Sequence, residues 1–296
     1  MKEKMKRKKH RVIKTLLLLF LLLILFLLFE LFVGGKMLQV TRTDVFSAGL
    51  PPEFDGFRIV QLSDVHGSLI GKDNRGILDR VRELSPDVIV LTGDLTDKRH
   101  PDTGRMTELA EKLCAIAPVY SVNGNHEAIM KPAEREKFLT ELKEKGVHVL
   151  ESETAALLRD GAGITLIGLK DPGQENGSWE KREAAVYDDL VRMVNASDGF
   201  TLVLSHRPEM AVKYAQAGAE LVLCGHAHGG QIRIPFLGGL YAPGQGLLPE
   251  YDSGLYRNGD TFLYVNRGIG NSVFPLRVLN RPEIALITLR CGTGER

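Results

Sequence analysis

Cysteine is scarce in this sequence, which has three cysteines among 296 residues. A sparse and odd set excludes a small disulfide-rich fold, although one pair could form in an oxidising compartment. We expect all three thiols to be free, with Cys114 and Cys224 packed in the core. No segment repeats at the period of a solenoid, which excludes a repeat architecture. The 44% hydrophobic and 25% charged residues are instead typical of a globular protein with a buried core.

Positive charge is missing from most of the chain. Residues 1–14 contain eight Lys or Arg residues and one Glu, yet the formal net charge of the whole chain is only +1. The remainder is therefore mildly acidic and has no basic stripe. Binding to nucleic acid depends on a basic face that releases counterions from the phosphate backbone. We therefore expect no nucleic-acid partner, and a nuclease activity is disfavoured.

One long hydrophobic run follows the basic residues. Residues 16–29 carry no charge, Glu30 interrupts the run, and residues 31–33 extend it to Gly34-Gly35. A membrane-spanning helix needs about 17–25 apolar residues, and the run reaches that length from Val12 if Lys14 extends toward the headgroups. A cleaved signal peptide is the alternative, but its apolar region is about 7–15 residues long and no A-x-A site follows this run. We predict a retained anchor.

The charge next to the run predicts its orientation, because basic residues stay on the cytoplasmic side of a membrane. We interpret residues 1–14 as a basic cytoplasmic tail and residues 15–33 as a transmembrane signal anchor. Residues 34–56 are then a linker leading into the folded part, and residues 57–296 form one domain. The predicted location is the cell membrane, with a single pass and the domain outside the cytoplasm.

Strand-like and helix-like segments alternate after residue 56. The patterns predict strands at 57–62, 87–91 and 119–122, with helices at 77–84, 106–116 and 131–145 between them. Short strands at 147–150, 155–158 and 164–167 follow, with Asp160-Gly161 as a hairpin turn. A helix at 179–195 precedes strands at 202–204, 221–223, 262–265 and 284–289. This order predicts an α/β fold of two packed mixed β-sheets flanked by helices.

Histidine and aspartate side chains cluster just after the strand-like runs. The relevant blocks are Asp64-Val65-His66, Gly93-Asp94, Gly124-Asn125-His126-Glu127, His206 and Gly225-His226-Ala227-His228. Ligands bind at the carboxyl ends of the strands in open α/β sheets, so these side chains are expected to converge on one rim. Taken alone, most of these blocks are typical of turns, caps or hydrogen-bonded loop residues. The two glycine-flanked histidines, His226 and His228, are a more specific indication of a functional site, because packing alone does not explain them.

Imidazole and carboxylate together suit Mn, Fe, Zn or Co better than a hard cation such as calcium. Seven such side chains are too many for one tetrahedral zinc ion. They suit two ions about 3.5–4 Å apart, the arrangement used for in-line displacement at phosphorus. The sequence therefore predicts two divalent metal ions as cofactors.

The order of the five blocks resembles that of the calcineurin-like metallophosphoesterases, over the span from Asp64 to Gly230. The continuation Gly229-Gly230-Gln231 is similar to a bacterial membrane-associated branch of that family, some of whose members hydrolyse UDP-2,3-diacylglucosamine at its pyrophosphate. The resemblance implies a phosphoester hydrolase, and with the anchor it implies a phosphodiesterase or pyrophosphatase acting on a membrane-lipid or cell-envelope substrate.

The resemblance also implies a role for each residue. One metal would be bound by Asp64, His66, Asp94 and His228, and the other by Asp94, Asn125, His206 and His226. His126 matches the family's catalytic histidine, which protonates the leaving group or stabilises phosphoryl charge. A metal-bound hydroxide would be the nucleophile, with no covalent phosphoenzyme. Two departures are Ala227, where many relatives have Thr, and Arg207, where Asn is common. Arg207 adds a cation that we expect to contact substrate.

Three alternatives remain open: a metal-binding scaffold without turnover, a phosphomonoesterase, and a signalling protein phosphatase. A degenerate scaffold would be expected to lose ligands, and this chain retains all seven together with His126. The predicted anchor and its charge bias argue against a signalling protein phosphatase.

The segment after the last block is unusually apolar for a stretch rich in glycine and proline. It runs from Ile232 to Tyr251 and includes Phe236 and Leu240. These side chains either pack over the sheet, or line an acyl-chain groove or enter the lipid interface, where aromatic residues with a polar tip are favoured. On the second interpretation, Phe236 and Leu240 bind a lipid-linked substrate.

Overall fold

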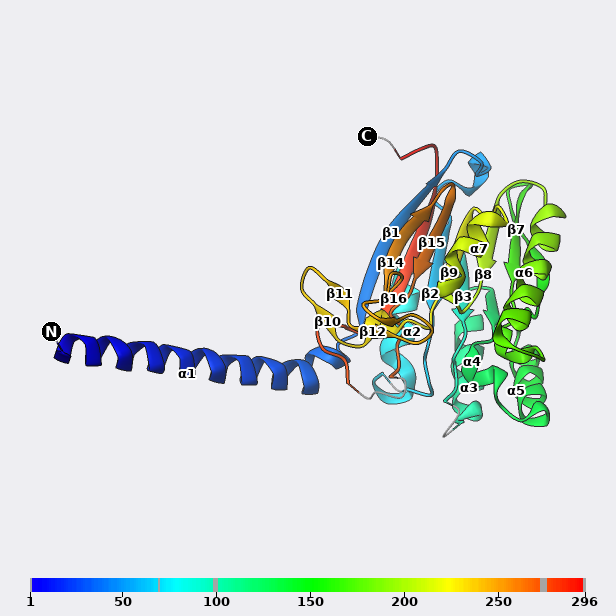
Figure 1. Cartoon of the computed structure of the whole chain (residues 1–296). Coiled ribbons are helices and arrows are strands. Elements are labelled where there is room, and N and C mark those ends of the chain that lie inside the picture. Colours follow the sequence, from blue (N-terminus) through cyan, green and yellow to red (C-terminus); the bar gives the residue numbers. More distant parts are fainter. Residues whose placement is uncertain (1, 69, 98–100, 272–275, 295–296) are drawn as a thin grey trace.

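A long helix precedes the folded body in the computed structural model, which describes residues 2–68, 70–97, 101–271 and 276–294 (Figure 1). This helix, α1 (Lys2–Phe32), includes the basic tail and the apolar run without a break at residue 15. Its length and composition allow it to cross a membrane, and almost none of its apolar stretch is buried in the protein. At 1.5 Å per residue it is about 46 Å long, more than the thickness of a bilayer core.

Two six-stranded sheets form the body. Their strand orders are β1-β16-β2-β3-β4-β5 and β14-β15-β9-β8-β7-β6. The first contains β1 (Gln39–Ser47), β2 (Arg58–Leu62), β3 (Val88–Thr92), β4 (Val119–Val122), β5 (Val147–Val149) and β16 (Glu283–Cys291). The second contains β6 (Glu153–Arg159), β7 (Ala162–Gly168), β8 (Thr201–Leu204), β9 (Leu221–Cys224), β14 (Gly254–Asn258) and β15 (Thr261–Val265).

The centre of each sheet is parallel and its margins are mixed. Strands β2 to β5 run parallel, and so do β7, β8, β9 and β15, while β6 and β14 form antiparallel edges. The predicted hairpin between β6 and β7 is confirmed, with Asp160 and Gly161 at positive φ in the turn. The parallel arrangement brings the carboxyl ends of neighbouring strands to the same edge of each sheet.

Helices cover the outer face of each sheet. The first is covered by α2 (Arg75–Leu84), α3 (Thr103–Cys114) and α5 (Pro132–Glu144), and the second by α6 (Trp179–Asn195) and α7 (Ala211–Gln216) (Figure 1). A single turn, α4 (Asn125–Ala128), follows β4. Pro132 begins α5, as expected from its fixed φ and missing N–H. The predicted fold class, two mixed sheets flanked by helices, is confirmed.

Burial on both faces explains why the strands read as continuous apolar runs. Successive residues of a strand point to opposite sides. In β2, Ile59 packs in the core between the sheets and Val60 packs in the core under the helices, and neither is exposed. Strands covered on both faces therefore have no polar alternation that would identify them as half-buried.

One segment differs from its expected structure. Residues 39–47, part of the predicted linker, form β1, which pairs in parallel with β16 at the edge of the first sheet. The sequence did not predict this strand, because six of its nine residues are polar. An edge strand with a solvated face permits such a composition. Its partner lies more than 200 residues away, so no local pattern indicates the pairing.

The cysteines are free among the described residues, as expected. Cys224 is buried in the core, Cys114 is half-buried against it, and Cys291 is exposed.

We expect the core between the sheets to dominate the stability of the body. Leu166 on β7 is fully buried there, so Leu166→Ala should lower the free energy of unfolding by about 2–5 kcal/mol through lost burial and a residual cavity. Leu158 on β6 is a matched control because it is 78% exposed, and Leu158→Ala should change stability by about 0.5 kcal/mol or less. Denaturant unfolding of both variants measures this difference; equal losses would contradict the described packing.

Candidate metal centre

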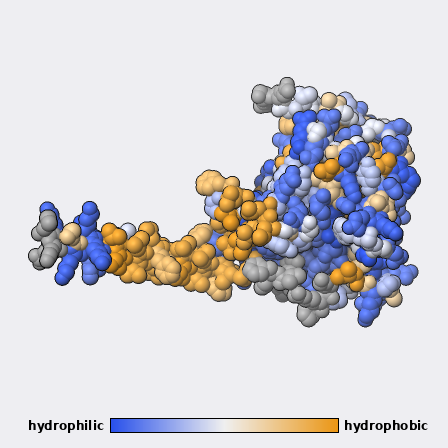
Figure 2. Space-filling model, viewed as in Figure 1, coloured by the Kyte–Doolittle hydropathy of each residue, from blue (hydrophilic) through white to orange (hydrophobic). Residues whose placement is uncertain are grey.

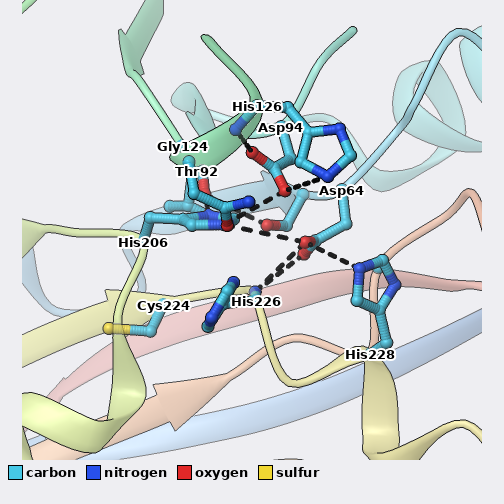
Figure 3. Close-up of polar contacts among 12 residues, drawn as sticks. Asp64, Thr92, Asp94, Gly124, His126, His206, Cys224, His226 and His228 are labelled. Atoms are coloured by element: carbon cyan, nitrogen blue, oxygen red, sulfur yellow. Dashed lines mark hydrogen bonds and ion pairs between the residues drawn. The ribbon is translucent and has the colours of Figure 1, made fainter. Parts of the chain in front are cut away.

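The structure brings together the eight residues that the sequence suggested as metal ligands or catalytic histidine. They lie at one edge of the paired sheets, each just beyond the carboxyl end of a strand. Figure 3 shows Asp64, Asp94, His126, His206, His226 and His228 gathered there. Asp64 and His66 follow β2, Asp94 follows β3, Asn125 and His126 follow β4, His206 follows β8, and His226 and His228 follow β9. Both sheets therefore contribute to one cluster.

Asp64, His66 and His228 form one group of potential ligands, each buried. The two imidazole Nε2 atoms lie 3.2 Å apart, and His228 Nε2 lies 3.3 Å from a carboxylate oxygen of Asp64. Their ligand atoms all lie within 4.8 Å of one another.

Asp94, His206 and His226 form a second buried group. His206 Nε2 lies 3.3 Å from Asp94 Oδ2 and 3.1 Å from Asn125 Oδ1. The same Asp94 oxygen lies 3.7 Å from His66 Nε2 in the first group. Asp94 is therefore placed between the two groups, where a bridging carboxylate would be needed.

This donor set fits divalent cations. Carboxylate oxygens and imidazole nitrogens converge with little solvent access, since Asp64, Asp94 and His206 are each 1% exposed or less. Neighbouring buried carboxylates are costly unless positive charge lies among them. The two groups of three potential ligands lie side by side, with Asp94 close to both. This arrangement suits two metal ions that share one carboxylate.

The pKa values of the clustered side chains also indicate a need for positive charge. Burial raises the pKa of the Asp64 carboxyl to about 6. Burial would lower the pKa of His206, but the carboxylates of Asp94 and Asp64 raise it to about 10. Burial lowers the pKa of His66 to about 4 and those of His226 and His228 well below the usual range. The carboxylates around His206 thus favour positive charge at this position, and a bound metal ion would supply such charge.

The backbone around the site is strained. Asp64, His66, Asp94, His226 and His228 all have φ between +48° and +67°, a region that non-glycine residues seldom adopt. Such conformations cost roughly 1–3 kcal/mol each and concentrate at functional sites.

Glycines allow the loops to approach closely. A Cβ at Gly124 would overlap the carboxylate of Asp94, and one at Gly225 would overlap that of Asp64. These overlaps explain the glycines before Asn125 and His226: only a residue without a side chain leaves room for the neighbouring carboxylate.

Outer hydrogen bonds orient the ligands. His206 Nδ1 lies 2.8 Å from the carbonyl oxygen of Thr92, so donation of Nδ1–H to this oxygen leaves Nε2 facing the cluster. The buried Glu127 carboxylate accepts hydrogen bonds from the backbone N–H groups of Asp94, Thr96 and Gly124. Glu127 was part of the recognised block but had no expected role, and it ties the Asp94 loop to α4.

His126 belongs to neither of these two groups, but with His66 and Asp94 it forms a third buried set whose potential ligand atoms lie within 4.8 Å of one another. Its Nε2 lies 3.9 Å from Asp94 Oδ2, and its backbone N–H donates to Asp94 Oδ1 at 2.8 Å. Its Nδ1 lies 3.8 Å from Asp97 Oδ2. The sequence analysis missed Asp97, although its position three residues after Asp94 in the same loop was an available signal.

Arg207 lies at the edge of the cluster but is bound to other protein groups. Its Nε and Nη2 donate to the two carboxylate oxygens of Asp171 at 2.6 and 3.0 Å. Its Nη1 lies 3.0 Å from His226 Nε2, and the guanidinium stacks over Trp179. Asp171, which the sequence analysis missed, thus holds this cation next to a potential ligand.

Phe236 and Leu240 lie outside the ligand cluster. Phe236 is fully exposed at the tip of a hairpin, and Leu240 is half-buried, with its N–H donating to the carbonyl oxygen of Gly230. The expectation that the whole apolar segment packs over the sheet is wrong for Phe236.

The candidate ligands lie in a region that this chain shares with known proteins. The family model described as Calcineurin-like phosphoesterase matches residues 57–230, which contain every ligand named above. The metallophosphoesterase YkuE of Bacillus subtilis is 34% identical over 86% of this chain and 86% of its own. The phosphodiesterase YaeI of Escherichia coli is 29% identical over 79% of this chain and 82% of its own. A transmembrane protein with metallophosphoesterase domain from Danio rerio is 31% identical over 81% of this chain and 55% of its own.

Replacing Asp94 and His126 separates metal binding from catalysis. Asp94→Ala should lower metal content and abolish most activity, because its carboxylate joins the two ligand groups. His126→Ala should keep nearly full metal content and lower kcat by roughly 10²–10⁴, as loss of a general acid does. Elemental analysis and steady-state kinetics on the same preparations measure both effects. Metal loss in His126→Ala with full occupancy in Asp94→Ala would reverse these roles.

Proposed function

The chain belongs to the calcineurin-like phosphoesterase family and is a phosphoester hydrolase, and on that premise we propose that it cleaves a phosphodiester or pyrophosphate bond with two divalent metal ions. The observation that carries this proposal is the placement of the Asp94 carboxylate between two buried groups of ligands. When bound, two such ions supply Lewis-acid activation of water and of the phosphoryl oxygens.

Each residue has a proposed part in this reaction. Asp94 would be shared by the two ions; one would be held in addition by Asp64, His66 and His228, and the other by Asn125, His206 and His226. His126 donates a proton to the leaving oxygen, a role supported by its position beside Asp94 and by the Asp97 carboxylate facing its Nδ1. The mixture of imidazole and carboxylate supports Mn, Fe, Zn or Co as the metal.

Arg207 is proposed to bind substrate as well as to orient His226. Its Nη1 reaches the ligand edge, while Asp171 holds the rest of the guanidinium in a bidentate pair. A guanidinium fixed in this way is pre-organised to hydrogen-bond a phosphoryl oxygen without losing side-chain entropy on binding.

The proposed substrate is an amphiphilic phosphoester of the membrane or cell envelope. Phosphodiester chemistry is supported by the similarity to a protein named as a phosphodiesterase. A lipid-linked substrate, comparable to the diacylated nucleotide sugars cleaved in the branch that the sequence resembles, is supported by α1, because an enzyme held at a membrane meets substrates that stay there. Phe236 and Leu240 are the proposed contacts for its acyl part.

We also propose that α1 is a retained single-pass anchor and that the folded body lies outside the cytoplasm. Eight basic residues precede the apolar run, and basic flanks stay cytoplasmic. Retention is supported by the end of the helix, where Gly34 and Gly35 are buried against the body.

The proposed reaction can be tested on the full-length protein in detergent micelles, loaded separately with Mn, Fe, Zn or Co. We expect chromogenic phosphodiesters and a lipid-linked pyrophosphate to be hydrolysed several-fold faster than a matched phosphomonoester. Faster monoester hydrolysis would favour a phosphomonoesterase or protein phosphatase, whereas fully loaded protein that turns over none of these substrates would indicate a metal-binding scaffold.

Topology is tested independently of activity. A reporter that is active only outside the cytoplasm, fused after Arg296, should give signal in cells, and a reporter active only inside should not. The reverse pattern would contradict the orientation. Recovery of protein whose N-terminus lies beyond Gly35 would show that the apolar run is a cleaved signal.

A further inference from the structure

Two short hairpins expose apolar side chains just beyond the last ligand loop. The first joins β10 (Arg233–Ile234) to β11 (Gly238–Gly239), and the second joins β12 (Tyr241–Ala242) to β13 (Gly246–Leu247). We call their exposed side chains the apolar rim: Phe236, Leu237, Tyr241, Leu247 and Leu248, with exposed fractions from 51% to 108%. Adjacent exposed apolar residues of this size are unusual for a surface that only meets water.

The rim carries no charge. Residues 234–249 include no Asp, Glu, Lys or Arg. Arg233, at the base of the first hairpin, turns back toward the body, where it lies 3.1 Å from Asp252 and donates to the Gly229 carbonyl. The exposed hairpin tips are therefore free of the charged residues that usually keep a surface loop in water.

Two rim residues are also held in an unfavourable backbone conformation. Phe236 has φ of 70° and Leu248 has φ of 52°, in a region that bulky residues seldom adopt. Their side chains gain little packing in return, because both are more than half exposed. Such outliers concentrate at functional sites, so the strain marks these hairpin tips as candidates for contact with another surface.

The rim lies next to the end of α1. Ile232, which precedes the first hairpin, pairs with Val278, and the N–H of Arg233 donates to the Val278 carbonyl at 2.9 Å. The next residue, Leu279, donates its N–H to the carboxylate of Glu30 in α1 at 3.0 Å. Figure 2 shows the apolar surface of this region beside the apolar shaft of α1.

The end of α1 is held firmly in this position. Glu30 is only 5% exposed although it interrupts an apolar run, and its carboxylate packs on Gly34. A Cβ at Gly35 would overlap the Arg277 carbonyl, so the helix end and this segment are in direct backbone contact. Phe32 and Val33 remain exposed there, and Lys36 follows them, placed to reach headgroups.

We propose that the apolar rim docks into the interface of the same lipid bilayer that α1 enters. A bilayer is the occupant that these contacts favour: its surface must lie where the apolar helix ends, and the rim is joined to that point through residues 278 and 279. Tyr241, with an apolar ring and a polar tip, is a residue type favoured at that depth.

Docking would also fix the distance between the candidate metal centre and the bilayer surface. Gly239 in the first hairpin packs backbone to backbone on Gly230, which ends the turn that contains His228. The N–H of Leu240 donates to the Gly230 carbonyl at 3.2 Å. A rim seated in the bilayer thus holds the ligand loop near the headgroups, where the phosphoester of a lipid-linked substrate lies. This last consequence rests on the proposed hydrolysis of a lipid-linked substrate, whereas docking itself rests only on the proposed anchoring of α1 in a bilayer.

Depth-dependent fluorescence quenching tests the docking in the full-length protein reconstituted in lipid nanodiscs. Phe236→Trp and Leu247→Trp place a probe on each hairpin, and Leu158→Trp is the control, because Leu158 is also highly exposed but lies on β6, an edge strand of the second sheet outside both hairpins. The parent protein corrects for Trp179, the single native tryptophan. Brominated lipids should quench both rim probes at a depth of about 5–10 Å below the headgroup boundary and leave the control at the parent level.

Absence of quenching beyond the parent level at both rim positions would overturn the proposal. So would probes shielded from an aqueous quencher but not quenched by brominated lipid, because that result indicates a second copy or another protein on the rim. Thermal unfolding of each variant confirms that the fold is retained. The measurement uses no substrate and is repeated in Asp94→Ala, so docking can fail while hydrolysis stands, and hydrolysis can fail while docking stands.

Discussion

A buried carboxylate is costly unless positive charge or hydrogen-bond donors surround it, and the rest of the metal centre is arranged around this constraint at Asp94. Asp94 is 1% exposed, and one of its oxygens faces imidazoles from both ligand groups. Its other oxygen accepts the N–H of His126, which fixes the direction of the carboxylate. The glycines, the strained φ angles and the Glu127 carboxylate all permit or maintain this close approach of loops.

Neither sheet could form the centre alone, so the packing between the sheets is part of the site. Gln61 on β2 is fully buried and donates to Thr92 in its own sheet and to the Cys224 carbonyl in the other. His206 extends from the second sheet to the Thr92 carbonyl of the first. These polar links lie directly beneath the ligands, and the apolar core between the sheets holds the two strand edges in register. A shift of one sheet past the other would separate Asp94 from His206.

The junction with α1 connects this architecture to the apolar helix. Glu30 is an acidic residue at the end of an apolar helix, where it would be costly without a partner. It accepts the Leu279 N–H, in a segment whose Arg277 donates to the carbonyl oxygens of Arg267 and Gly270. The N–H of Gly270 in turn donates to the carbonyl oxygen of Asp64. A set of side-chain and backbone hydrogen bonds thus joins the end of α1 to Asp64, a proposed metal ligand.

The sequence by itself determined the fold class, the positions of most strands and the blocks of candidate metal ligands, because apolar runs, strand-end Asp and His residues and the glycines beside them are local features. It did not indicate β1, whose polar strand is stabilised by a partner more than 200 residues away. The pairing of Arg207 with Asp171, the placement of Asp97 opposite His126 and the burial of Glu30 depend on segments that meet only in the folded chain. The sequence also did not indicate that the apolar rim is exposed, because the same apolar residues suit a core or a surface. Only the tertiary structure decides which surroundings they have.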